Sequence, residues 1–196
     1  MHLRIAEYAA TPARRRSMAL IAVNLALFAA LFAFMYHTRA ITPNWPGMAE
    51  IGQQPFEFGS LLMVAAMGMS AICASITMAV GANSAAQGKF EEAVRWIAIA
   101  ISAWLVFLFL ECVEWVRMVY LVELGPHTPF GETYLLITGA HWLAVIACTT
   151  WFTLVVSDVR RRDILAAALY SHFLAILWIV IVVLLYLPNM NPLMDL

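Results

Sequence analysis

Charged side chains are scarce in this chain of 196 residues, because Asp, Glu, Lys and Arg together make up 12% of it. Soluble domains contain about 25% charged and about 45–50% apolar residues, whereas 64% of this sequence is hydrophobic. This composition excludes an ordinary soluble domain and predicts an all-α integral membrane protein. The formal net charge is −1, so the chain lacks the basic field that would attract nucleic acid.

Cysteine is also rare. Cys73, Cys112 and Cys148 each lie inside an apolar run, and no Cys-x-x-Cys pair occurs. This placement indicates small core residues and disfavours disulfide or metal chemistry. Because the sequence also lacks internal repeats and low-complexity linkers, we expect one membrane domain.

Five apolar runs approach or exceed the length of about 20 residues that a membrane-spanning helix needs. We predict five transmembrane helices over residues 18–37, 59–80, 93–121, 132–156 and 164–187, within a membrane domain of residues 18–187. Residues 1–17 are expected to form a cytoplasmic segment and residues 188–196 a short external tail. The first run is longer than the core of a signal peptide, which favours a span.

The distribution of Lys and Arg predicts the orientation of these helices. The N-terminal segment, the region after the second span and the loop after the fourth span carry four, two and three such residues. Only Arg39 and Arg117 fall on the other side. Since positive residues accumulate on the cytoplasmic side, we predict a cytoplasmic N-terminus and a periplasmic C-terminus.

Three ionisable residues are expected to meet inside the membrane, where such groups often have functional roles. Glu111 and Glu114 are three residues apart and share a helix face, and His141 lies at a similar distance from the outer end of the next span. A hydrogen-bonded pair that fixes helix packing and a proton relay both fit this arrangement. A two-metal site is disfavoured because Glu-x-x-His, which such bundles use on two helices, is replaced by a single Glu-x-x-Glu.

A second polar site is expected in the last span, around Tyr170, His172 and Trp178. His172 fits a hydrogen-bonded core histidine, and contact with a lipid headgroup, a partner subunit or a proton path remains open. Haem ligation by His141 and His172 is disfavoured because they enter their helices from opposite ends. We therefore assign no catalytic residue and no metal ligand.

Two arginine clusters flank the spans on the predicted cytoplasmic side. They comprise Arg14, Arg15 and Arg16, and Arg160, Arg161 and Arg162. Such clusters set topology and also attract anionic lipid headgroups, at about 1 kcal/mol per residue. We expect both clusters to have both roles.

The later spans resemble subunit III of the haem-copper oxidases, the respiratory cytochrome c and quinol oxidases. That family carries Thr-Gly-x-His-x-x-His-Val in its penultimate helix, where this chain has Thr138, Gly139, His141 and Val145. Its last helix carries Tyr-Trp-His-Phe-x-Asp-x-x-Trp, matched in this chain by the residues Tyr170, His172, Phe173 and Trp178. Ser75-Ile76-Thr77 and Glu114-Trp115 also resemble family positions. Five spans match the short bacterial form.

The chain departs from these patterns at positions with polar or large side chains in the family. Ala144 stands where the family has a second histidine, Ser171 where it has tryptophan, and Ala175 where it has aspartate. Asn24 occupies the position of an acidic residue linked to proton uptake. The resemblance therefore implies packing and lipid binding more than proton uptake.

The resemblance predicts a non-catalytic accessory subunit in the bacterial cytoplasmic membrane. It would stabilise the catalytic subunit I, adjoin subunit II and bind structural phospholipids, with haem and copper held by the partner catalytic subunit and no cofactor bound directly. The divergence would also suit a subunit III-like component of a nitric oxide reductase or of an unusual oxidase supercomplex. A stand-alone proton or cation transporter that uses Glu111, Glu114 and His141 is the alternative from a different class. The sequence leaves the electron donor and the terminal acceptor open.

Overall fold

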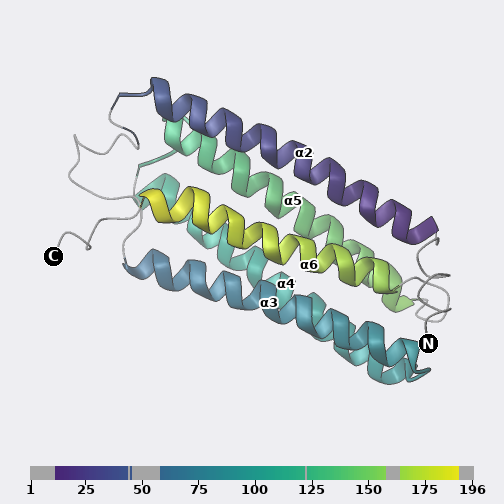
Figure 1. Ribbon diagram of the computed structural model, residues 1–196. Coiled ribbons are helices and arrows are strands. Elements are labelled where there is room, and N and C mark those ends of the chain that lie inside the picture. The colour runs from purple at the N-terminus through teal and green to yellow at the C-terminus, as the bar shows by residue number, and fades with distance from the viewer. Residues whose placement is uncertain (1–11, 44, 46–57, 122, 158–163, 190–196) are drawn as a thin grey trace.

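Five long helices lie side by side in the computed structural model (Figure 1). The structure describes residues 12–43, 45, 58–121, 123–157 and 164–189. The helices are α2 (Pro12–Ile41), α3 (Phe58–Ala86), α4 (Phe90–Val116), α5 (Pro129–Ser157) and α6 (Ile164–Ile181). All five are long and apolar enough to cross a membrane, which confirms the predicted all-α class and the five apolar helices.

The helix boundaries differ from the predicted spans mainly at the N-terminus. α2 begins at Pro12, inside the segment expected to precede the membrane, because alanine and arginine are good helix formers and continue the helix beyond the apolar run. Residues 1–11, 158–163 and 190–196 lie outside the described residues. The division into a membrane domain and two flanking segments stays a prediction.

Two helices change to a wider π-helical winding near the same end of the bundle. α4 continues as η1 (Arg117–Leu121), and α6 continues as η2 (Val182–Tyr186) followed by the short η3 (Leu187–Asn189). π-Helical turns are rare and often occur at functional sites. The residues that lie between α4, α5 and α6 at this end are therefore candidates for a functional site.

The turn between α3 and α4 shows how the sequence ends one helix and starts the next. Gly88 has a φ of 78°, a conformation that glycine adopts without steric penalty. The amide of Lys89 donates to the Ser84 carbonyl and that of Gly88 donates to the Ala85 carbonyl, the two bonds of a Schellman motif. This turn lets α3 and α4 form the most extensive helix–helix interface in the described residues.

The start of α5 is fixed by a side-chain cap and by close backbone packing. The amide of Gly131 donates to Thr128 Oγ1, and Pro129 occupies the first helical position, where its missing amide hydrogen is harmless. A Cβ atom on Gly131 would lie 2.2 Å from the Gly125 carbonyl oxygen. Only glycine therefore allows the preceding loop to pack this closely on α5.

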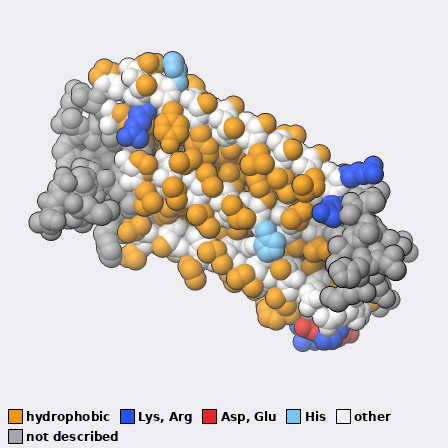
Figure 2. Space-filling model, viewed as in Figure 1, with side chains coloured by type: hydrophobic (Ala, Val, Ile, Leu, Met, Phe, Trp, Pro, Cys, Tyr) orange, Lys and Arg blue, Asp and Glu red, His pale blue; other side chains and the backbone are white. Residues whose placement is uncertain are grey.

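Aromatic side chains from α4, α5 and α6 fill the middle of the bundle. Phe107 contacts Trp104, His141 and Trp178, with ring centroids 4.9–5.5 Å apart, and Trp178 also contacts Tyr186 at 5.8 Å. α2 packs against α5 and α6. The face shown in Figure 2 is hydrophobic along most of its length, with Lys and Arg near its two ends, as expected for a chain that spans a membrane.

Candidate functional site

A buried ion pair lies where α4 passes into η1. Arg117 Nε donates to Glu114 Oε2 at 2.9 Å, and Nη2 donates to Oε1 at 2.7 Å. The Glu114 side chain is fully buried and that of Arg117 is 19% exposed. The two-pronged geometry matches the planar guanidinium to both carboxylate oxygens. From the sequence, Arg117 was counted only as a charge on the external side, although its position three residues after Glu114 is the spacing that lets helical side chains meet.

Glu111 lies one turn earlier on α4 and is also fully buried. It neighbours Glu114, Trp115 and Thr138, but both of its carboxylate oxygens lack a hydrogen-bond partner among the described residues. The adjacent hydrogens are directed elsewhere, because Trp115 Nε1 donates to Thr138 Oγ1 and Thr138 Oγ1 donates to the Tyr134 carbonyl. Glu111 is therefore a buried acid whose neighbouring donors are engaged by other acceptors.

Two tyrosines lie beside these acidic residues, at the end of the bundle where η1 and η2 occur. The hydroxyl groups of Tyr134 on α5 and Tyr186 on η2 lie 3.0 Å apart, and their rings pack edge to face. Both tyrosines are within electrostatic range of Glu111 and Glu114. The acidic residues and the tyrosines come from α4, α5 and η2. Neither tyrosine was predicted from the sequence, because each resembles an ordinary aromatic residue near a helix end.

The predicted contact between His141 and Glu111 or Glu114 is absent from the described structure. His141 Nε2 lies 3.1 Å from the Leu174 carbonyl oxygen on α6, and its ring packs against Phe107 on α4. Phe107 is one helical turn before Glu111, so the predicted depth was wrong by about 6 Å. In the part of the chain that the structure describes, His141 Nδ1 has no hydrogen-bond partner.

The three residues expected to form a last-helix site point to different neighbours. The Tyr170 hydroxyl accepts a hydrogen bond from Asn24 on α2, and His172 Nδ1 bonds to Ser75 Oγ on α3. Trp178 is buried in the aromatic core, where no described residue bonds to its Nε1. The residues are eight positions apart at most, but the helical twist turns them toward different helices.

An apolar groove runs over α5 between α2 and α4. Its floor includes Gly139 and Ala140, whose small side chains leave space between the larger residues. The other lining residues are Leu27 and Leu31 on α2, Trp115 on α4, and Leu135, Leu136, Trp142 and Leu143 on α5. A Cβ atom on Gly139 would contact no other part of the protein within 4 Å. The groove is therefore lined by apolar residues and is open above Gly139.

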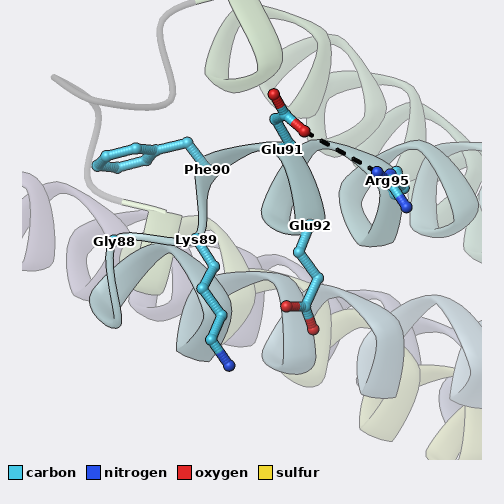
Figure 3. A pocket seen from close by; sticks show the side chains of 6 residues that line it. All are labelled: Gly88, Lys89, Phe90, Glu91, Glu92 and Arg95. Carbon is cyan, nitrogen blue, oxygen red and sulfur yellow. Dashed lines mark ion pairs between the residues drawn. The ribbon is translucent and has the colours of Figure 1, made fainter.

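The charged ends of the bundle carry the remaining candidate residues. Arg14, Arg15 and Arg16 lie in the first turns of α2, whereas Arg160, Arg161 and Arg162 lie outside the described residues. A depression at the α3–α4 turn is lined by residues 88–92 and Arg95 (Figure 3). There Glu91 points toward Arg95, with which it forms an ordinary surface ion pair, while Lys89 and Glu92 extend to the opposite side (Figure 3).

The described residues contain no group of three or more His, Cys, Asp or Glu side chains that could hold a metal ion. The two histidines deepest in the helices do not converge, because His141 bonds to α6 and His172 bonds to α3. These residues do not fit haem or copper ligation, which needs convergent imidazoles.

Comparison with known proteins identifies relatives along most of the chain. Cytochrome c oxidase subunit 3 of Latimeria chalumnae is 28% identical over 169 residues, covering 79% of this chain and 61% of that protein. The subunit 3 of Bacillus sp. (strain PS3) is 24% identical over 172 residues, covering 84% of this chain and 80% of that protein. This chain is a distant homologue of cytochrome c oxidase subunit 3. The homology and the five apolar helices confirm the predicted resemblance.

The extent of the similarity varies among the subunit 3 proteins. The Drosophila melanogaster protein is 21% identical over 193 residues, covering 91% of this chain and 71% of that protein. The chain spans 61% of the length of the Latimeria chalumnae protein. No family model matches the chain.

Two departures of this subunit 3 homologue from the expected motifs, Ser171 and Asn24, form hydrogen bonds between helices. Where the resemblance implies a tryptophan, the chain has Ser171, and Trp104 from α4 donates from Nε1 to Ser171 Oγ at 3.2 Å. Asn24 donates both to the Leu20 carbonyl and to the Tyr170 hydroxyl. A neutral amide thus links α2 to α6 at a position where the resemblance implied an acid.

Proposed function

We propose that this chain is a non-catalytic accessory subunit of a haem-copper respiratory oxidase. It would lie in the bacterial cytoplasmic membrane with its N-terminus in the cytoplasm and its C-terminus in the periplasm. The observation that carries the proposal is similarity to cytochrome c oxidase subunit 3 over 79–91% of the chain. The partners would be the catalytic subunit I and subunit II, and the catalytic partner would hold haem and copper.

The packing of the polar residues supports a scaffolding role. The Tyr134–Tyr186 bond joins α5 to η2, and the bond from Trp115 to Thr138 joins α4 to α5. The bidentate Glu114–Arg117 pair lies within the continuous α4–η1 helix. Hydrogen bonds inside a membrane fix the relative positions of helices that the hydrophobic effect alone would leave free to slide. A subunit with this rigid interior would hold the catalytic subunit in its active form during turnover.

Phospholipid binding is the second part of the proposed role. The groove over Gly139 and Ala140 would hold one acyl chain, and the arginines at the start of α2 would attract an anionic headgroup at the cytoplasmic surface. Arg160, Arg161 and Arg162 would extend that basic surface. These are two separate lipid contacts, because the groove lies farther along α2, at Leu27 and Leu31.

Gentle purification tests the subunit assignment. We expect the chain to co-purify with haem-bearing subunits, which an absorption spectrum and mass spectrometry would detect. Isolation as a colourless homo-oligomer would refute the proposal. The haem spectrum, the electron donor and turnover with oxygen or nitric oxide would separate a cytochrome c or quinol oxidase from a nitric oxide reductase.

A filled groove tests the lipid role. Gly139→Leu should reduce the phospholipid retained by the purified complex, while Ala147→Leu, which adds the same side chain on α5 outside the groove, should not. Quantitative lipid mass spectrometry would measure this difference. Equal lipid content in the two variants would contradict the proposed acyl-chain site.

One observation favours a proton or cation transporter as a second candidate. Glu111 is a fully buried carboxyl group without a hydrogen-bond partner among the described residues, as in many proton-carrying sites within membranes. Such a path would use Glu111 and Glu114, and His141 would need to turn away from Leu174 to join it. Proton flux in vesicles that contain the chain alone, abolished by Glu111→Gln, would support this function over the accessory role.

A further inference from the structure

A polar pair lies at the surface of the bundle between α3 and α6, which pack side by side (Figure 1). Ser75 Oγ is hydrogen-bonded to His172 Nδ1. Ser75 is 6% exposed, whereas His172 is only partly buried. No described residue forms a hydrogen bond with His172 Nε2. The polar atoms that are fully buried and lack a partner do not include this nitrogen. Nε2 is therefore accessible at the surface.

This accessible nitrogen lies deep within the membrane-spanning part of the chain. His172 is eight residues from the start of α6, or about 12 Å along the helix axis, and Ser75 is eleven residues, about 16 Å, from the end of α3. A hydrocarbon core of about 30 Å places both residues near its middle.

The polar pair is surrounded by exposed apolar residues, so lipid hydrocarbon would contact it unless another protein covers this surface. Ile72 and Ile76 on α3 and Ile176 on α6 are 39%, 56% and 61% exposed. A polar imidazole nitrogen without a partner is unfavourable in such surroundings, and membrane proteins normally bury it against another polar group. By contrast, the outer face of α4 presents bulky apolar residues such as Leu105 and Phe109, which suit lipid contact.

We propose that a transmembrane helix of a partner oxidase subunit packs over the α3–α6 seam and supplies a side chain that hydrogen-bonds to His172 Nε2. The seam comprises Ser75, His172 and the three exposed isoleucines. The inference rests on the proposed function, because it assigns the face by which the accessory subunit contacts the complex. Exposed Ala65 and Ala66 on α3 further favour a protein neighbour, since small residues allow helices to approach closely.

Photo-crosslinking in the assembled complex tests the location of the contact. A benzophenone amino acid at Ile176 should link the chain to a haem-bearing subunit, and the same group at Phe109 on the outer face of α4 should link only to lipid. A subunit adduct at Phe109 but not at Ile176 would overturn the inference, as would an adduct with a second copy of this chain at Ile176. If the chain purifies without any haem-bearing subunit, the proposed function fails and this inference fails with it.

Substitution of the pair tests the hydrogen bond itself. Ser75→Ala combined with His172→Leu removes both partners and leaves neither orphaned. Interhelical hydrogen bonds in membranes are worth roughly a three- to twenty-fold change in equilibrium, so retention of the chain in the complex should fall by that factor. The stability of the chain alone should fall only by the fraction that loss of the single Ser75–His172 bond explains, and His172→Gln should restore most of the retention. Unchanged retention of the double variant in an intact haem-containing complex would refute the contact and leave the proposed function standing.

Discussion

Replacing Glu114 with glutamine tests the buried ion pair, because the substitution removes the charge and almost preserves the volume. Glu114 is fully buried, and its two oxygens accept bonds of 2.9 and 2.7 Å from Arg117. Removing one partner of a buried ion pair destabilises a protein by about 3–5 kcal/mol. Arg117 is 19% exposed and can extend toward the membrane surface. We therefore expect the lower end of that range, about 3 kcal/mol.

A matched control lies at the other end of α4. Glu91 and Arg95 form an ion pair at 4.0 Å, with side chains that are 94% and 78% exposed. Exposed pairs contribute about 0–1 kcal/mol, so Glu91→Gln should leave stability nearly unchanged. Glu114→Gln combined with Arg117→Gln should recover most of the loss, because neither charge is then left without its partner.

Unfolding of the purified chain in mixed detergent micelles, followed by circular dichroism during titration with dodecyl sulfate, would measure these differences. The same variants should assemble poorly into the complex, yet electron transfer per intact complex should match wild type. We expect the same division between assembly and turnover for His141→Leu. The reasoning is refuted if Glu114→Gln is as stable as Glu91→Gln, or if the double variant is as unstable as Glu114→Gln alone.

Three further sets of substitutions probe neighbouring features by the same unfolding assay. Glu111→Gln should leave stability unchanged or raise it, because the carboxylate has no hydrogen-bond donor among the described residues; a loss like that of Glu114→Gln would contradict this. Gly131→Ala should destabilise by about 1–3 kcal/mol, since its Cβ would collide with the Gly125 carbonyl, while Gly139→Ala has open space and should be tolerated. Tyr134→Phe and Tyr186→Phe should each lose about 1 kcal/mol, and the double variant should lose no more than one of them if their hydroxyl bond is the interaction removed.

Composition and run length were enough to predict the helices. A span needs a continuous apolar stretch of known length, and each predicted span overlaps one helix of the bundle. The boundaries were less predictable where charge and helix propensity disagree. Arg14, Arg15 and Arg16 precede the apolar run, but they still belong to α2, because arginine favours helical structure.

The pairing of polar residues could not be predicted from depth alone. Counting residues along the helices predicted His141 beside Glu111 with an error of about one turn. That error is decisive, because His141 then contacts Phe107 and not the carboxylate. The Glu114–Arg117 pair could have been predicted from the spacing of three residues on one helix. The Tyr134–Tyr186 contact depends on how α5 and η2 approach each other, which no local pattern in either segment specifies.

Buried acids such as Glu114 are compatible with the proposed accessory role, because a polar residue can serve packing as well as proton transfer. In the interior, Glu114 pairs with Arg117 within the α4–η1 helix, and Tyr134 pairs with Tyr186 between α5 and η2. At positions where the resemblance implies ionisable side chains, the chain has Ala144, Ala175 and Asn24, and Asn24 serves as a neutral link to Tyr170.

His172 differs from these interior groups, because it combines a bond within the chain with a second nitrogen that reaches the surface at membrane depth. Such a nitrogen gives the proposed subunit a specific means of contacting a neighbour. The polar groups in the interior would then set the shape of the subunit, and His172 would set its position in the complex.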